Sequence, residues 1–243
     1  MANTQKKLIA VHGDKGGIGK STAAGLGVDY ALTHYGAAAV VEGDTTIADV
    51  ARRFGEVQGV QGFVVDLSRS DAPAEAVIGL FEELEKAGLP PVVIINTPAS
   101  ASKTLDAQAE VLVSAAHDMN YSVRVAWLIG PDDDSATLSA ASKLCALADR
   151  KVAVVNDRFG TANKYPWFRH PARAAWLQSG GLESALPLLT ERAALAVKEH
   201  MGRYSTLADQ GSPLTIITRR YVGDWVRQSF AGPMEMLFAD SGE

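Results

Sequence analysis

The sequence of 243 residues contains one cysteine, few aromatic side chains and no long hydrophobic run. The single cysteine, Cys145, cannot form an internal disulfide, and it lies within a run typical of a helix, so we interpret it as a packing residue. No apolar stretch reaches the length of a membrane span, and the first residues lead into a strand without the apolar core of a signal peptide. These absences favour a cytoplasmic protein without redox chemistry.

Positive charge is not in excess either, because the formal net charge is −5 at pH 7. This value excludes a globally basic nucleic-acid coat but permits a local basic surface. Hydrophobic residues make up 47% of the chain and charged residues 21%, which is typical of a folded globular protein and excludes disordered and fibrous classes. The length suits one α/β domain, so we predict a single domain over residues 1–243.

Short apolar runs alternate with segments of helical periodicity along most of the chain. The runs are Leu8 to Val11, Ala38 to Val41, Gly62 to Val65, Val92 to Ile95, Val123 to Ile129 and Val152 to Val155. Continuous runs of this kind suit strands buried on both faces, and the helical segments between them include 74–87 and 104–116. The alternation predicts a single doubly wound, mostly parallel sheet flanked by helices, with ligands at the carboxyl ends of the strands.

The first apolar run leads into a glycine-rich segment that reads Asp14-Lys15-Gly16-Gly17-Ile18-Gly19-Lys20-Ser21-Thr22. Glycines let a backbone wrap closely around phosphate oxygens, and the helix-compatible run that follows would point its N-terminus at the anion. Lys20 is placed to reach the β- and γ-phosphates, Ser21 to bind Mg²⁺, and Thr22 to contact the α-phosphate. The pattern predicts a phosphate-binding loop, and a simple glycine-rich turn is the alternative.

The strict phosphate-loop pattern requires glycine where this chain has Asp14. The sequence Lys-Gly-Gly-x-Gly-Lys-[Ser/Thr] resembles instead the deviant Walker A loop of the ParA/MinD family of P-loop ATPases, in the SIMIBI class. The resemblance implies a P-loop NTPase fold that binds ATP and Mg²⁺. The implied nucleotide-binding residues are Gly16, Gly17, Ile18, Gly19, Lys20, Ser21 and Thr22.

The resemblance also implies a role for Lys15, which otherwise reads as a solvated loop lysine. In the family, the first lysine of the loop crosses an ATP-dependent homodimer and contacts the nucleotide of the partner subunit. A lysine donated in this way would stabilise the negative charge of the reacting phosphates, as an arginine finger does. We therefore expect an ATP-dependent homodimer.

The second apolar run is followed by Glu42-Gly43-Asp44-Thr45-Thr46, where the family has an Asp-x-Asp pair. The resemblance implies that Asp44 positions the attacking water and a Mg²⁺-bound water. The alternative is that Asp44 caps a helix that starts near Thr45. Glu42 replaces the first aspartate of that pair, and its side chain is longer by one methylene. Its role stays open.

The fourth run ends in Asn96-Thr97-Pro98, which resembles a Walker B segment, a buried strand followed by Asp-x-Pro. Asn96 takes the place of the acid. An amide can hold a Mg²⁺-bound water but brings no charge to counter the metal, so we expect slow hydrolysis or weaker metal affinity. Asp66, at the end of another run, is the alternative acid.

Asn156 follows the sixth apolar run and resembles the asparagine with which the family reads the adenine edge. A strand-ending asparagine in an ordinary turn is the alternative. Leu186-Pro187-Leu188-Leu189 resembles the segment that backs the base. The acidic stretch 132–134 is typical of a helix start rather than of a metal site.

The C-terminal region is amphipathic, and we expect a helix over about 218–238 to pack on the domain. Membrane binding, which one branch of the family achieves through a terminal helix, is not favoured because basic residues are few and the end is acidic. A DNA-facing surface would instead draw on scattered basic residues. These are Arg169, His170, Arg173, Arg203, Arg219 and Arg220.

The motifs together predict a Mg²⁺-dependent ATP hydrolase, with Lys15, Lys20 and Asp44 as catalytic residues. The metal ligands would be Ser21, Asp44 and Asn96. The tail and segment 156–160 look most like plasmid-encoded relatives that serve partition, stability or conjugal transfer, so DNA or a DNA-bound protein is the expected partner. The alternatives are a non-hydrolysing nucleotide-sensing adaptor, motivated by Asn96, and an ATP-dependent ligase of small molecules, for which the sequence offers no second substrate pocket.

Overall fold

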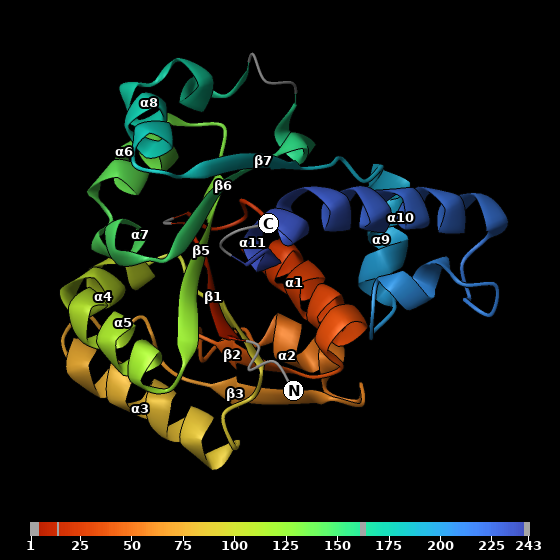
Figure 1. Cartoon of the computed structure of the whole chain (residues 1–243). Coiled ribbons are helices and arrows are strands. Elements are labelled where there is room, and N and C mark those ends of the chain that lie inside the picture. The colour runs from red at the N-terminus through yellow and green to blue at the C-terminus, as the bar shows by residue number, and fades with distance from the viewer. Residues whose placement is uncertain (1–4, 14, 161–163, 241–243) are drawn as a thin grey trace.

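A seven-stranded sheet forms the centre of the computed structural model, which describes residues 5–13, 15–160 and 164–240 (Figure 1). The strand order is β3-β2-β4-β1-β5-β6-β7, and each neighbouring pair among these strands is parallel. The strands are β1 Lys6–His12, β2 Ala38–Glu42, β3 Val60–Val64, β4 Val92–Asn96, β5 Tyr121–Ile129, β6 Arg150–Asn156 and β7 Leu182–Leu186. The predicted doubly wound parallel sheet is confirmed.

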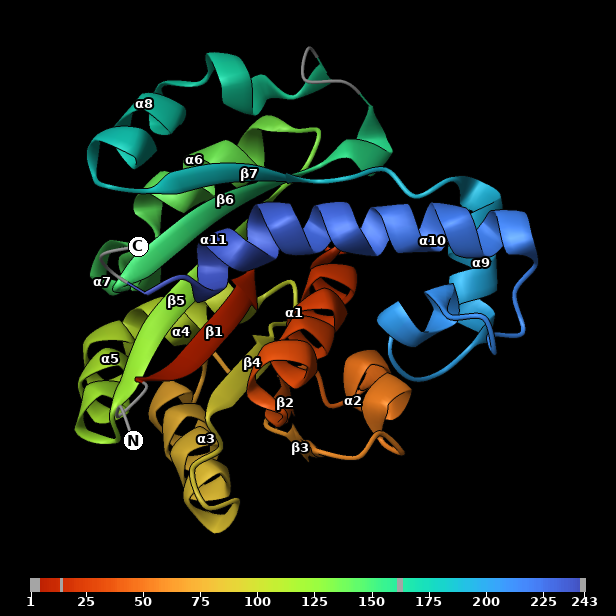
Figure 2. The same ribbon diagram turned by 45° about the vertical axis from the view of Figure 1, so that its right-hand side comes forward.

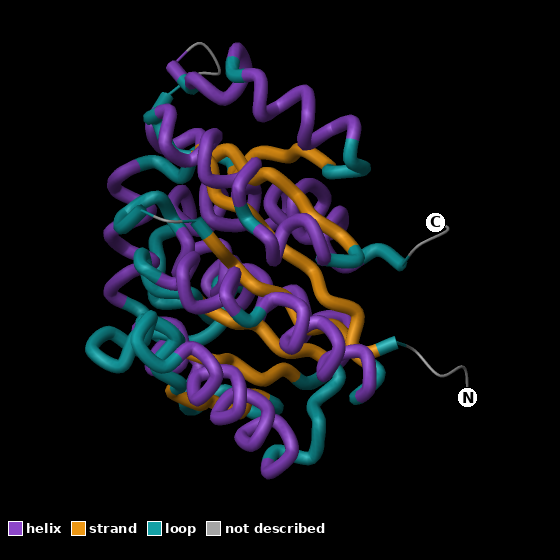
Figure 3. Tube along the Cα trace, turned by 90° about the vertical axis from the view of Figure 1, so that its left-hand side faces the viewer, coloured by secondary structure: helices purple, strands orange, loops and turns teal. Residues whose placement is uncertain are grey.

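Helices cover both faces of the sheet, and Figure 3 shows the strands lying between the two helical layers. In β1 the side chains of Leu8 and Ala10 join one buried cluster, whereas Ile9 and Val11 join the other, because successive side chains of a strand point to opposite faces. This two-sided burial is the reason that the strands read as unbroken apolar runs.

One helical layer packs against the face that Leu8 and Ala10 share. It contains α3 Pro73–Lys86, α4 Ala101–Ala107, α5 Ala109–Asp118, α6 Asp133–Ala141, α7 Lys143–Leu147 and α8 Pro171–Gln178. The opposite layer contains α1 Lys20–Tyr35, α2 Asp49–Phe54, α9 Glu191–Glu199, α10 Ile216–Ser229 and α11 Glu235–Phe238. The site described below lies at the carboxyl ends of the strands, where β1, β2, β4 and β6 lead into loops.

The structure differs from the sequence prediction in two elements. The expected helix over 104–116 is two helices, α4 and α5, because Gln108 between them adopts φ −117° and ψ 13°. The edge strand β7 was absent from the predicted strands, since its sequence Leu-Glu-Ser-Ala-Leu is short, polar and mostly half-exposed. All six predicted strands are confirmed, and each of their ends lies within two residues of the predicted end.

The single cysteine lies in α7 and is buried, as predicted. Burial raises the pKa of the Cys145 thiol to about 12, so the group stays protonated and unreactive at pH 7. The aromatic and basic excursion after β6 forms 3₁₀ turns at Asp157–Phe159 and Pro166–Arg169, with Tyr165 and Trp167 buried.

The C-terminal segment belongs to the helical layer that contains α1. Its helix α10 packs against α9 (Figure 2). The indole N–H of Trp225 donates to the Pro187 carbonyl at 3.0 Å, and Val222 and Val226 are buried beside it. A π-helical turn, Phe230–Met234, then leads into α11. None of the described helices is long and apolar enough to cross a membrane.

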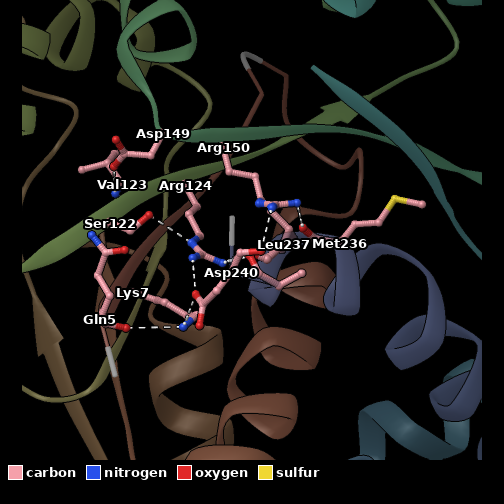
Figure 4. A network of polar contacts seen from close by, with 11 residues as sticks. Gln5, Lys7, Ser122, Val123, Arg124, Asp149, Arg150, Met236, Leu237 and Asp240 are labelled. Carbon is pink, nitrogen blue, oxygen red and sulfur yellow. Dashed lines mark hydrogen bonds and ion pairs between the residues drawn. The ribbon is translucent and has the colours of Figure 1, made fainter. Parts of the chain in front are cut away.

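Two buried cations hold the end of this segment against the amino ends of the strands (Figure 4). The side chain of Lys7 is fully buried and that of Arg124 is 2% exposed, and both bind Asp240 Oδ1 at 2.9 Å. Arg124 Nη1 also donates to the carbonyl oxygens of Leu237 and Ala239 at 2.8 Å. Asp240 thus provides the counter-charge for two cations that are removed from water.

Candidate nucleotide-binding site

The glycine-rich loop lies where the sequence predicted it, after β1 and before α1, which begins at Lys20. Asp14 lies outside the described residues. Gly17 has φ +75° and Gly19 has φ +106°, conformations that residues with a Cβ rarely adopt. This strand-loop-helix arrangement directs the N-terminus of a 16-residue helix into the loop, which is the usual setting for binding an anion.

The ammonium group of Lys20 closes the loop. Its Nζ donates to the carbonyl oxygen of Gly13 at 2.9 Å and to that of Lys15 at 2.6 Å. The residue is only 8% exposed. The cation is therefore positioned inside the loop by two backbone acceptors before any ligand is present.

Asn156, the predicted adenine reader at the end of β6, binds the loop itself. Its Nδ2 donates to the Ile18 carbonyl at 2.9 Å, and its Oδ1 accepts from the Arg158 N–H at 3.1 Å. Half of the donors and acceptors of this amide are thus engaged within the chain. The asparagine connects the loop to the far half of the sheet, and its role toward adenine stays a prediction.

We expect Gly19→Ala to damage the loop much more than Gly16→Ala. A Cβ on Gly19 would lie 2.3 Å from Asn156 Nδ2 at a positive φ, whereas a Cβ on Gly16 would meet no atom within 4 Å. Strain of this kind costs about 1–3 kcal/mol. Chemical denaturation of the two variants measures the difference, and equal stabilities would contradict the loop geometry.

Three side chains meet below the loop, from α1, β2 and β4. Asn96 Nδ2 donates to Glu42 Oε2 at 2.8 Å and lies 3.4 Å from Ser21 Oγ. Asn96 Oδ1 is buried and has no hydrogen-bond partner among the described residues. A buried oxygen without a donor suits a ligand that supplies one, and Ser21 and Asn96 are both among the predicted metal ligands.

The structure defines the contacts of Glu42, whose role the sequence left open. Its Oε1 accepts from the backbone N–H groups of Val50 and Ala51 at 2.7 and 2.8 Å, so the carboxylate caps the first turn of α2 from outside the helix. Burial raises the pKa of Glu42, while the hydrogen bonds from Ala51, Asn96 and Val50 oppose that rise.

Asp44 does not cap a helix at Thr45, because α2 begins only at Asp49. Its carboxylate instead accepts from the Thr46 N–H at 2.8 Å within the loop. Asp66, the alternative acid, accepts from both the N–H and the hydroxyl of Ser68 at the end of the edge strand β3. Asn96 rather than Asp66 therefore contacts Ser21.

Lys15 is held by its own chain in this structure. Its Nζ lies 3.0 Å from Asp132 Oδ2 and 2.9 Å from Asp134 Oδ2, at the start of α6. The hydrogen bonds to Asp134 and then to Asp132 raise the pKa of Lys15. The acidic stretch is a helix start, as predicted, and the sequence did not indicate that it also binds this lysine.

A buried histidine at the end of β1 was missed by the sequence analysis. Thr97 donates its hydroxyl to the Val11 carbonyl at 3.0 Å, so it accepts from His12 Nδ1 at 3.0 Å, and Nε2 faces the Ser102 hydroxyl at 3.4 Å. Burial and then the charge of Lys20 lower the pKa of His12 to about 3. This neutral imidazole links the start of the glycine-rich loop to the segment after β4, and its position just before Gly13 was the one sequence feature that could have indicated it.

Several of the six basic residues proposed for a DNA-facing surface make contacts within the chain, and the surface itself stays a prediction. Arg173 pairs with Glu183, and Arg203 pairs with the buried Asp29 of α1. Arg219 donates to the carbonyl oxygens of Asp209 and Gln210.

Known proteins match this chain in separate comparisons of sequence and of structure. Protein MobD of Acidithiobacillus ferrooxidans is 26% identical over 189 residues, which cover 77% of this chain and 80% of MobD. No protein-family model matches the chain.

Among solved structures, the cell division ATPase MinD of Pyrococcus furiosus matches with a TM-score of 0.49 and 15% identity, over 91% of this chain and 97% of MinD. The MinD cell division protein of Aquifex aeolicus matches with a TM-score of 0.48 and 14% identity, over 93% and 97% of the two chains. The fold itself rests on the strand order and pairing described above.

Proposed function

We propose that this chain is an ATP- and Mg²⁺-binding switch ATPase. The observation that carries the proposal is the glycine-rich loop at the carboxyl end of β1, with the buried Lys20 ammonium held inside it by two carbonyl oxygens. Loop N–H groups and the N-terminus of α1 would bind the phosphates, and Lys20 would neutralise their charge. The nucleotide-binding residues are then those of the loop, 16–22, with Asn156 beside the base.

The residues below the loop fit a Mg²⁺ ion that takes its other ligands from phosphate oxygens and water. Ser21 would supply its hydroxyl, and the buried Oδ1 of Asn96 would accept from a metal-bound water. The bound ion would screen the charge of the phosphates. Asp44, in the loop between β2 and α2, would orient the attacking water.

Dimerisation with ATP would bring Lys15 to the nucleotide of the partner subunit. In this structure Lys15 pairs with Asp132 and Asp134, so it would have to leave both carboxylates to act across an interface. The side chains of Lys15, Asp132 and Asp134 are 40%, 35% and 65% exposed, and ion pairs in contact with water are weak, so their release would cost little free energy.

Light scattering of the protein without nucleotide, with Mg²⁺-ADP and with Mg²⁺-ATP tests this proposal. We expect a dimer with Mg²⁺-ATP alone. Lys15→Ala should stay monomeric under all three conditions while it still binds ATP. The matched control is Lys86→Ala, which removes an exposed lysine that pairs only with its own helix. A wild-type monomer that binds ATP would remove Lys15 from the mechanism.

The process served would be plasmid partition, stability or conjugative transfer. The C-terminal tail and segment 156–160 support this reading through their resemblance to plasmid-encoded relatives. DNA, or a protein bound to DNA, would then be recognised on surfaces outside the nucleotide site.

A non-hydrolysing nucleotide-sensing adaptor is the second candidate, because Asn96 brings no charge to the place of the Walker B acid. Phosphate release by the wild type and by Asp44→Ala separates the two functions. Equal release would favour the sensor.

A further inference from the structure

A buried carboxylate lies beside the amide that stands in the place of the Walker B acid. Strands β2 and β4 are neighbours, and their pairing places Glu42 opposite Asn96 at the carboxyl end of the sheet. Glu42 is fully buried and Asn96 is 6% exposed, with 2.8 Å between Oε2 and Nδ2. The two side chains therefore lie side by side at the carboxyl end of the sheet, next to Ser21.

The orientation of Glu42 is determined by groups on both of its oxygens. Oε1 accepts from the N–H groups of Val50 and Ala51, and Oε2 accepts from Asn96. Ala48, at the N-cap of α2, has no side chain that can accept from these N–H groups. These three hydrogen bonds favour the ionised carboxylate and oppose burial, which raises the pKa of Glu42.

The orientation of Asn96 follows from that of Glu42. Because Nδ2 is the donor to the carboxylate, Oδ1 is turned the other way, where it is buried without a partner. A buried oxygen without a hydrogen-bond donor is destabilising. The pair is therefore arranged for a further donor beside Ser21.

We infer that Glu42 is a positioning residue that supplies the negative charge of the metal site from β2, in place of the acid missing from β4. It directs the carbonyl oxygen of Asn96 toward a water of the Mg²⁺ ion. It also ties α2, which follows the Asp44 loop, to the same carboxylate. This inference rests on the proposed binding of Mg²⁺-ATP.

A charge exchange between the two positions tests the inference. The affinity of a fluorescent ATP analogue is measured in Mg²⁺ and in EDTA for the wild type, Glu42→Gln, Asn96→Asp and the double variant. Glu42→Gln should lose about 10–100-fold of the Mg²⁺-dependent gain in affinity while its affinity in EDTA is unchanged. The double variant should recover most of the gain, since a carboxylate again faces an amide. Glu82→Gln, an exposed change on α3, is the control.

The possible results distinguish failure of the inference from failure of the metal site and of the proposed function. A Glu42→Gln chain with the full Mg²⁺-dependent gain would overturn the inference and leave Glu42 as a cap of α2, with the proposed function intact. A double variant that recovers nothing would also overturn it. A wild type that binds the analogue equally in Mg²⁺ and EDTA would end both the inference and the metal site, and one that does not bind it would end the proposed function as well.

Thermal unfolding in EDTA gives a second readout that does not depend on Glu42→Gln folding well. Asn96→Asp places two carboxylates in contact, so its midpoint should fall below that of the wild type and rise again when Mg²⁺-ATP is added. An unchanged midpoint would show that the two side chains do not interact and would overturn the inference.

Discussion

ATP affinity is expected to fall about 10–100-fold when Lys20 is replaced by alanine, since a hydrogen bond to a charged group contributes about 1.5–3 kcal/mol. The ammonium already lies inside the loop, bound to the carbonyl oxygens of Gly13 and Lys15. A ligand phosphate would meet this cation without a costly rearrangement. Isothermal titration of Lys20→Ala against the wild type measures the loss.

Lys20→Gln separates the charge of this residue from its contribution to the loop. Glutamine can still donate to a loop carbonyl, so its thermal midpoint should stay closer to that of the wild type than the midpoint of Lys20→Ala does. Its ATP affinity should be as low as that of the alanine variant, because the charge is gone. Undiminished ATP binding by both variants would exclude the phosphate-loop interpretation.

The second large effect concerns stability, and it involves Arg124 at the opposite end of the sheet. Arg124→Met keeps most of the apolar stem but removes the donors to the carbonyl oxygens of Leu237 and Ala239 and one of the two cations on Asp240. We expect the free energy of unfolding to fall by about 2–4 kcal/mol, because these contacts are buried. Urea denaturation measures this change, and hydrogen exchange in α11 should increase with it.

Arg227→Met is the matched control for that prediction. Arg227 pairs with Asp224 on the surface of α10, and its side chain is 72% exposed. Exposed pairs of this spacing contribute about 0.5 kcal/mol or less. Equal losses in the two variants would show that the C-terminal segment is not anchored by the buried cations.

Much of the candidate site was accessible from local sequence patterns. The strand-loop-helix around Lys20 is encoded by an apolar run, closely spaced glycines and a helix-forming segment, all within about thirty residues. Asn96 and Asn156 were found because each ends an apolar run, and parallel strands deliver their carboxyl ends to one edge of the sheet.

Contacts across that edge were not accessible in the same way. The pair of Glu42 and Asn96 depends on β2 lying next to β4, and the strand order of a parallel sheet leaves no periodic signal in the sequence. The binding of Lys15 by Asp132 and Asp134 likewise joins residues from two loops that follow neighbouring strands. For the same reason the sequence indicated only Asp44 as an alternative helix cap, at a helix near Thr45, whereas the structure shows Glu42 capping α2.

The sequence by itself determined the alternation of strands and helices, the two-sided burial of the sheet and the position of the glycine-rich loop. These features arise from residue spacing and backbone freedom within short segments, which act before any distant contact forms. Only the tertiary structure decided which polar and charged side chains meet: Glu42 with Asn96, Lys15 with its two aspartates, and Asp240 with Lys7 and Arg124. Such pairs depend on strand order and on packing between elements far apart in the chain, because electrostatic contacts act over a few ångströms in space, whatever the separation in sequence.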